Sequence, residues 1–105
     1  MLCKYLEKTV RLLPDENEKE FGNMIELDYY LMESNSALNN ESTEEKVYGI
    51  EIVKKENSKP VENDSIRDIS IYRDNTRYIL DKLADNIVTP MELKYILDDI
   101  IGVWG

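Results

Sequence analysis

The stretch from residue 89 to residue 102 constrains the fold more than any other part of the sequence, because both of its ends carry helix signals. Thr89 suits the N-cap position, and the side chain of Glu92, three residues later, can bond back to the N-cap N–H, which makes a capping box. Pro90 suits the first helical position, and Gly102 suits the left-handed residue that ends a helix. The sequence therefore predicts one complete helix over residues 89–102.

This helix needs a surface to pack on, because apolar residues recur along one side of it at helical spacing. The members of this stripe are Leu93, Ile96, Leu97, Ile100, Ile101 and Trp104. Upstream, residues 24–32, 47–55 and roughly 64–72 alternate between apolar and polar side chains, which is typical of strands with one buried face. The apolar face of the first strand contains Ile25, Leu27, Tyr29 and Leu31.

The segments between these elements indicate how they are connected. Residues 34–45 are rich in Ser, Asn and Glu and predict a long loop, and residues 56–60 predict a turn. A further helix is expected from Asp74 or Asn75 to about Ala84. Its apolar stripe is Ile79, Leu80, Leu83 and Ile87. The sequence therefore predicts an α+β fold, a three-stranded antiparallel meander followed by two helices packed on one face (β-β-β-α-α).

Residues 1–23 lack the alternating pattern of the strands that follow. We expect an N-terminal arm and acidic linker over residues 1–23, followed by a single domain over residues 24–105. The residues near one helical face of the arm are Leu2, Tyr5, Leu6, Thr9 and Leu13. Pro14 follows as a stop, so the arm is predicted to be a short amphipathic helix. An extended conformation of residues 9–13 is the alternative. Residues 14–20 have the composition of a solvated linker.

The composition excludes several classes of partner and compartment. The net charge is -9, from 22 acidic and 13 basic side chains, which opposes binding to DNA, RNA or an anionic membrane. Cys3 is the only cysteine, so no intramolecular disulfide can form. Charged residues interrupt the first apolar positions, which argues against a signal peptide or a membrane span. We expect a cytoplasmic protein.

The residue types needed for common catalytic chemistry are missing. The chain has no histidine, which removes Ser-His-Asp and Cys-His catalysis and the commonest ligand of transition metals. The four glycines are scattered, so there is no glycine-rich phosphate loop. Asp81 with Asp85, and Asp98 with Asp99, are carboxylate pairs for which a solvated acidic face is favoured over cation binding or catalysis. We predict no enzyme activity, no catalytic residue, no cofactor and no metal ligand, and we expect Cys3 to be an inert thiol.

Tyrosine is abundant, with seven residues, and tyrosine is a common anchor of protein interfaces. The residues that fall outside the predicted core form a possible interaction surface: Tyr30, Tyr72, Met91, Tyr95, Asp98 and Asp99. The alternative is that these tyrosines are ordinary half-buried residues of a small sheet. A helix-turn-helix is a further alternative for the two helices, but the acidic residues of the second helix would repel DNA phosphates.

Four short motifs occur in a characteristic order: residues 48–52 (YGIEI), 66–70 (IRDIS), 88–93 (VTPMEL) and 98–101 (DDII). In this order they resemble a family of small uncharacterised clostridial proteins, a domain of unknown function. The resemblance covers most of residues 24–102 and leaves out the arm before Met24. It implies a cytosolic bacterial protein without an assigned activity, so it carries over no functional residue.

Two functions are consistent with these features. The leading hypothesis is a non-enzymatic protein-interaction or regulatory module, whose simplest form is self-association as a homodimer through an exposed strand or helix face. The alternative is a small-ligand or cation-binding domain that uses carboxylates and tyrosine hydroxyls between the sheet and the helices.

Overall fold

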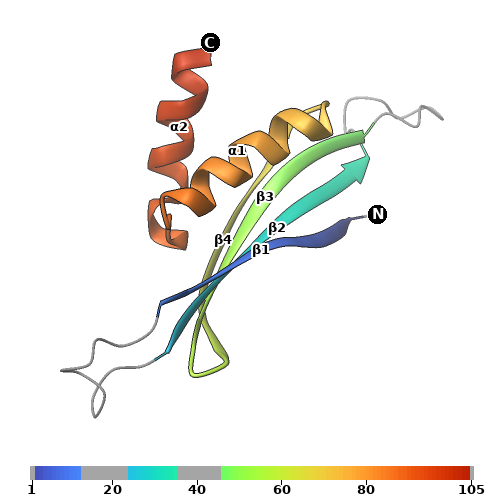
Figure 1. Cartoon of the computed structure of the whole chain (residues 1–105). Helices are drawn as coiled ribbons and strands as arrows, with labels where there is room; N and C mark the ends of the chain where they lie inside the picture. Colours follow the sequence, from blue (N-terminus) through green and yellow to red (C-terminus); the bar gives the residue numbers. More distant parts are fainter. Residues whose placement is uncertain (1, 13–23, 36–45, 105) are drawn as a thin grey trace.

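The structure, a computed structural model, describes residues 2–12, 24–35 and 46–104. The elements are β1 (Cys3–Leu12), β2 (Ile25–Asn35), β3 (Lys46–Glu56), β4 (Lys59–Ser70), α1 (Arg73–Asp85), the short 3-10 helix η2 (Pro90–Glu92) and α2 (Leu93–Trp104). The four strands form one antiparallel sheet in the order β1-β2-β3-β4 (Figure 1). The predicted linker at 14–20 and residues 36–45 of the predicted loop lie outside the described residues. The other two loop residues, Ser34 and Asn35, end β2.

The predictions of a three-stranded sheet and of an N-terminal helical arm are wrong, because residues Cys3–Leu12 form the edge strand β1. β1 pairs with β2 on either side of a bulge, where Leu6 is opposite Tyr30 and Lys8 is opposite Tyr29. The unpaired residue between them is Glu7. One extra residue reverses the alternation of the side chains. Leu6 and Val10 are four positions apart yet lie on opposite faces, so β1 lacks the period-two pattern that would predict a strand.

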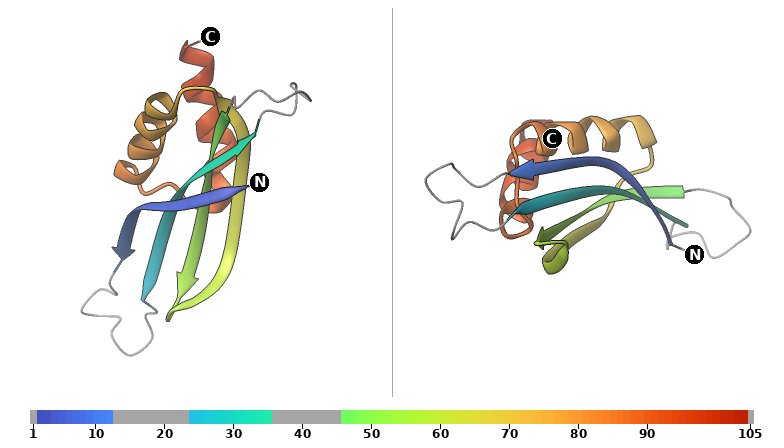
Figure 2. Two further views of the ribbon diagram at one scale, coloured as in Figure 1. Left: turned by 90° about the vertical axis from the view of Figure 1, so that its right-hand side faces the viewer. Right: turned by 60° about the horizontal axis from the view of Figure 1, so that its bottom comes forward.

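Both helices cover the same face of the sheet (Figure 2). α1 lies over β2 and β3, η2 contacts β3 and β4, and α2 contacts β4. The core side chains with an exposed fraction of 1% or less are Leu27, Tyr29, Leu31, Ile50, Ile52, Ile79, Leu80, Leu83, Leu93 and Leu97. Full burial of one such side chain contributes about 1.5–3 kcal/mol, so this layer is the main source of stability. These residues confirm the predicted apolar faces of β2, of α1 and of α2 as far as Leu97, except that Ile87 is 42% exposed. Ile101 and Trp104 of the predicted stripe are not among the side chains that the structure describes.

The β3–β4 hairpin extends further than the sequence predicts. Asn57 and Ser58 both have positive φ angles, of 50° and 71°, as in the two-residue turns that match strand twist. β4 therefore begins at Lys59 and ends at Ser70. Tyr72, predicted on a strand face, lies outside the strand at the N-cap position of α1.

Near its end β4 bulges opposite Gly49. Tyr48 pairs with Ser70 and Ile50 pairs with Ile66, so three residues of β4 face one residue of β3. A Cβ atom on Gly49 would lie 2.4 Å from the Ile66 carbonyl oxygen. The middle residue of the bulge, Asp68, has a φ of 58°. The bulge thus requires a glycine at its partner position.

The helix ends differ in how well the sequence predicts them. The capping box is confirmed: the Glu92 carboxylate accepts hydrogen bonds from the Thr89 N–H (3.2 Å) and hydroxyl (2.9 Å). The first turn is nevertheless a 3-10 helix, and α2 continues past Gly102 to Trp104. The predicted caps of α1, Asp74 and Asn75, lie inside the helix.

α1 ends in a Schellman motif. The Ile87 N–H donates to the Ala84 carbonyl (3.1 Å), and the Val88 N–H donates to the Leu83 carbonyl (3.0 Å). Ile87 occupies the left-handed position of this motif with a φ of 53°. The side chain of Ile87 is therefore directed out of the apolar stripe to which its spacing assigned it. Among the described residues, no helix is long and apolar enough to span a membrane.

Candidate functional site

Two surfaces of the molecule are candidates for a functional site, because charged or exposed apolar side chains gather on them. The first, which we call the open face, is the side of the sheet opposite the helices. Cross-strand partners share a face of a sheet, so the register defines its polar members. They are Lys4, Thr9, Arg11, Glu26, Asp28, Tyr30, Ser34, Glu51, Lys55, Asn63 and Ser65.

Asp28 is the most buried polar group of the open face, with 3% of the residue exposed. The Lys55 ammonium lies 2.9 Å from one carboxylate oxygen, and the Thr9 hydroxyl donates to the other (2.9 Å). The hydrogen bond and the charge of Asp28 raise the pKa of Lys55 above its ordinary value. Glu26 lies beside this group and pairs with Arg11 at 3.0 Å. Both carboxylate oxygens of Asp28 are therefore bonded to side chains of neighbouring strands.

Glu51 forms the second centre of the open face. Lys4 approaches one of its carboxylate oxygens to 2.6 Å, and the Asn63 amide donates to the other (3.2 Å). The Lys4 ammonium also lies 5.1 Å from the centre of the Tyr30 ring, within the range of a cation–π contact. Tyr30 is thus a half-buried member of an ion-pair network.

The open face is already satisfied by its own residues. In the part of the chain that the structure describes, no buried side-chain nitrogen or oxygen lacks a hydrogen-bond partner. No group of three or more Cys, Asp or Glu side chains among these residues could hold a metal ion. A ligand that bound here would have to displace existing ion pairs.

Tyr29 is the one tyrosine hydroxyl in the core between the sheet and the helices. It donates a hydrogen bond of 2.8 Å to the Val88 carbonyl. Burial and the nearby Glu92 carboxylate raise its pKa to about 12. Tyr29 is therefore a neutral donor whose hydrogen bond connects β2 to the segment between the two helices. We interpret its role in the core as structural.

The second surface, which we call the outer face of α2, consists of Met91 of η2 together with Tyr95, Asp98 and Asp99 of α2. Met91 and Tyr95 are 76% and 75% exposed, more than any other large apolar side chain that the structure describes between residues 2 and 100. They are one helical turn apart, and Asp98 and Asp99 follow Tyr95 at the next turn, also exposed. Leu93 and Leu97, on the opposite side of the helix, are buried in the core.

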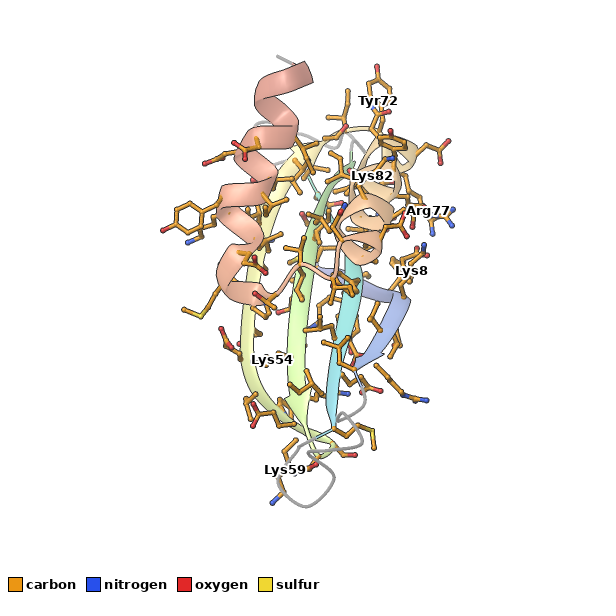
Figure 3. The ribbon with its side chains drawn as sticks, turned by 60° about the vertical axis from the view of Figure 1, so that its left-hand side comes forward. Lys8, Lys54, Lys59, Tyr72, Arg77 and Lys82 are labelled. Atoms are coloured by element: carbon orange, nitrogen blue, oxygen red, sulfur yellow. The ribbon has the colours of Figure 1, made fainter. Side chains whose placement is uncertain are left out.

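The structure brings together four of the six residues predicted as an interaction surface. Tyr72 is 63% exposed but lies at the start of α1 (Figure 3). Tyr30 lies on the open face, across the sheet from the helices. The sequence could not predict the open-face network, because the strand that supplies Lys4, Thr9 and Arg11 has no clear alternation.

The charges of the two surfaces differ. On the open face each acidic group has a cationic partner, as in the pairs of Glu26 with Arg11 and of Asp28 with Lys55. On the outer face of α2, no ion pair within the described residues includes Asp98 or Asp99. This surface therefore combines exposed apolar side chains with two carboxylates that are in no ion pair of the described residues.

A protein-family model, described as a family of unknown function (DUF6514), matches residues 8–103. The chain belongs to this family. The DUF6514 match begins within β1, so it includes much of the segment that the sequence resemblance left out. It also contains the whole outer face of α2. Curated proteins and solved structures yield no match to this DUF6514 chain.

Proposed function

We propose that this chain is a non-enzymatic protein-interaction module that binds its partner through the outer face of α2. The observation that carries this proposal is the exposure of Met91 and Tyr95, one turn apart, at 76% and 75%. From the resemblance and the single cysteine, we also propose that the protein is bacterial and works in the cytoplasm.

The fold itself gives these two side chains no role. α2 is anchored by Leu93 and Leu97, which are buried on its inner side. Met91 and Tyr95 remain in water, where their apolar area contributes little to stability. Burying such a side chain in an interface contributes about 1.5–3 kcal/mol. Tyrosine is a frequent interface anchor, and methionine adapts its shape to a partner.

No comparable observation favours the alternative of a small-ligand or cation-binding domain. The space between the sheet and the helices is occupied by apolar side chains with 1% exposure or less. The hydroxyl of Tyr29, which such a site would need, is bonded to the Val88 carbonyl. The carboxylates of Asp28 and Glu51 are bonded to residues of the same sheet.

A photo-crosslinking amino acid placed at position 95 tests the proposal in living cells. We expect a discrete adduct, and we expect Met91→Ser to abolish it. The matched control carries the same amino acid at Lys59, an exposed residue of the β3–β4 hairpin at the end of the sheet away from α2 (Figure 3). The same adduct from position 59, or no adduct from position 95, would contradict the proposal. An adduct of twice the chain mass would identify self-association.

A further inference from the structure

We infer that the partner segment bound by the outer face of α2 is cationic and amphipathic, with an apolar side chain seated on Met91 and Tyr95 and Lys or Arg residues facing Asp98 and Asp99. This inference rests on the proposed function and names the chemistry of the partner at that same surface.

The local charge favours a cationic partner. Residues 91–99 contain three acidic side chains and one basic one. The carboxylate of Glu92 accepts hydrogen bonds from Thr89, and no ion pair among the described residues includes Asp98 or Asp99. The one basic residue of the segment, Lys94, lies one helical turn before Asp98. Opposite potentials across an interface steer association and fix the orientation of the partner. A segment with Lys or Arg next to its apolar anchor would supply the missing charge.

Several acidic side chains elsewhere in the molecule are paired with cations, whereas Asp98 and Asp99 are in no ion pair of the described residues. The acidic side chains of β2 are paired with Lys or Arg, as in the contacts of Glu26 with Arg11 and of Glu33 with Lys46. Asp81 of α1 likewise faces Lys8 at 3.4 Å. Two adjacent unpaired carboxylates beside two exposed apolar side chains therefore form a surface that is complementary to a basic amphipathic segment.

The same charges disfavour a second copy of the chain as the occupant. A two-fold dimer through this surface places the same acidic patch on both sides of the interface. Each chain also has a net charge of -9. Like charges placed face to face at an interface suppress that pairing, which leaves a partner of opposite charge as the better fit.

Two synthetic peptides provide the test: 14-residue amphipathic helices with identical leucine positions, one with lysine and one with glutamate at every polar position. We expect the Leu/Lys peptide to shift the amide NMR signals of residues 91–99 in a saturable way. The Leu/Glu peptide should bind at least fivefold more weakly. Removing two exposed charges in Asp98→Asn/Asp99→Asn should weaken binding of the Leu/Lys peptide about fivefold and reduce its salt dependence.

A matched variant separates local charge from net charge. Asp74→Asn/Asp85→Asn removes two exposed carboxylates from α1 and should leave the affinity nearly unchanged. Equal weakening by both double variants would overturn the inference in favour of non-specific attraction to an acidic protein.

The remaining outcomes distinguish the inference from the proposed function. Equal binding of both peptides at residues 91–99 would overturn the cationic partner and leave the interaction surface standing. Shifts of other residues only, or no shifts, would overturn the use of this surface itself. A dimer in sedimentation that Met91→Ser dissociates would identify a second copy as the occupant and would also overturn the inference.

Discussion

Gly49 is a position of β3 where the backbone of β4 leaves no room for a side chain. A Cβ atom there would lie 2.4 Å from the Ile66 carbonyl oxygen and 2.9 Å from the Arg67 Cα. Both contacts are with backbone, which cannot rotate away as a side chain can. From the sequence alone Gly49 is only a glycine within an alternating strand, because the bulge that approaches it lies seventeen or more residues later in the chain.

We expect Gly49→Ala to lower the free energy of unfolding by about 2 kcal/mol, since an added methyl group in a closed site forces the backbone to shift. Urea denaturation followed by circular dichroism measures this. Ser65→Ala, on the same hairpin, is the control and should change stability by less than about 0.5 kcal/mol. Equal stability of Gly49→Ala and the wild-type protein would show that the bulge can relax.

Ile87 shows the opposite kind of mismatch, a β-branched residue where the backbone favours glycine. Its φ of 53° costs a side-chain-bearing residue roughly 1–2 kcal/mol. Periodicity assigned Ile87 to the apolar stripe of α1, because spacing alone does not reveal where the helix ends. Asn86, a residue that tolerates left-handed conformations, stands one position too early to mark the turn.

Ile87→Gly should therefore raise the free energy of unfolding by about 1 kcal/mol, after allowance for the greater freedom of glycine in the unfolded chain. Thermal and urea unfolding both report this change. Ile71→Gly is the matched control, because Ile71 is similarly exposed but does not have a positive φ. That control should lose stability, and a loss in Ile87→Gly as well would contradict the strain argument.

Among the elements, those with local signals were predictable and those that depend on distant partners were not. The start of η2 and α2 follows from Thr89, Pro90 and Glu92, which interact within one turn. β2 and β3 have unbroken alternation, so their buried faces follow from the sequence. β1 has a bulge at Glu7, and the bulge is specified by pairing with β2 and by contact with α1. Arg77 of α1 lies 3.7 Å from the Glu7 carboxylate.

The hydrogen bond from Tyr29 to Val88 links β2 to the segment between α1 and η2. Tyr29→Phe leaves the Val88 carbonyl without its donor, and we expect a loss of about 1–2 kcal/mol at neutral pH. Urea unfolding measures this loss. Tyr95→Phe is the control, because the Tyr95 side chain is exposed and its substitution should be nearly neutral.

The same variant has a specific pH signature. The pKa of Tyr29 is about 12 in the folded chain and has an ordinary value of 10.0 when unfolded, so the folded state holds this proton more tightly. The stabilisation is complete below pH 10 and is lost as the pH rises from 10 to 12. Tyr29→Phe should therefore lose less stability over this interval than the wild-type protein. An unchanged pH profile would contradict the assignment.

The molecule as a whole presents one apolar and one ionic side of a single sheet. The α+β class and the placement of both helices on one face follow from the sequence. The additional strand, β1, does not follow from the sequence. Without β1, the contacts that Lys4, Thr9 and Arg11 make on the open face cannot be predicted. Two of the partners of Glu51 and Asp28, Lys4 and Thr9, are on β1.

Asp28→Ala tests how much this ionic side contributes. It leaves Lys55 and Thr9 without their closest partner, and we expect a loss of about 2 kcal/mol in urea unfolding. Asp85→Ala, at an exposed carboxylate, is the control and should stay within about 0.5 kcal/mol of the wild-type value. A loss no larger than that of the control would show that the ion pairs contribute nothing.

The Lys55 ammonium adds a pH dependence to this prediction. Its pKa is raised from an ordinary value of 10.5 by Asp28, so the stabilisation is present below pH 10.5 and is lost as the pH rises through the raised value. Asp28→Ala removes the main cause of the raised pKa, so this variant should lose less stability over this interval than the wild-type protein. Unfolding curves between pH 9 and 12 measure the difference.

The bulges in the two edge strands also bear on how these molecules behave when crowded together. An unbroken edge offers a template on which strands of other chains can stack into fibrils. Here β1 is interrupted at Glu7, and β4 is interrupted between Ile66 and Ser70 and has Pro60, which lacks an N–H, near its start. A foreign strand could follow either edge for only a few residues. We therefore expect the sheet to resist aggregation through its edges, and we expect a partner to contact side chains and not the backbone of an edge strand.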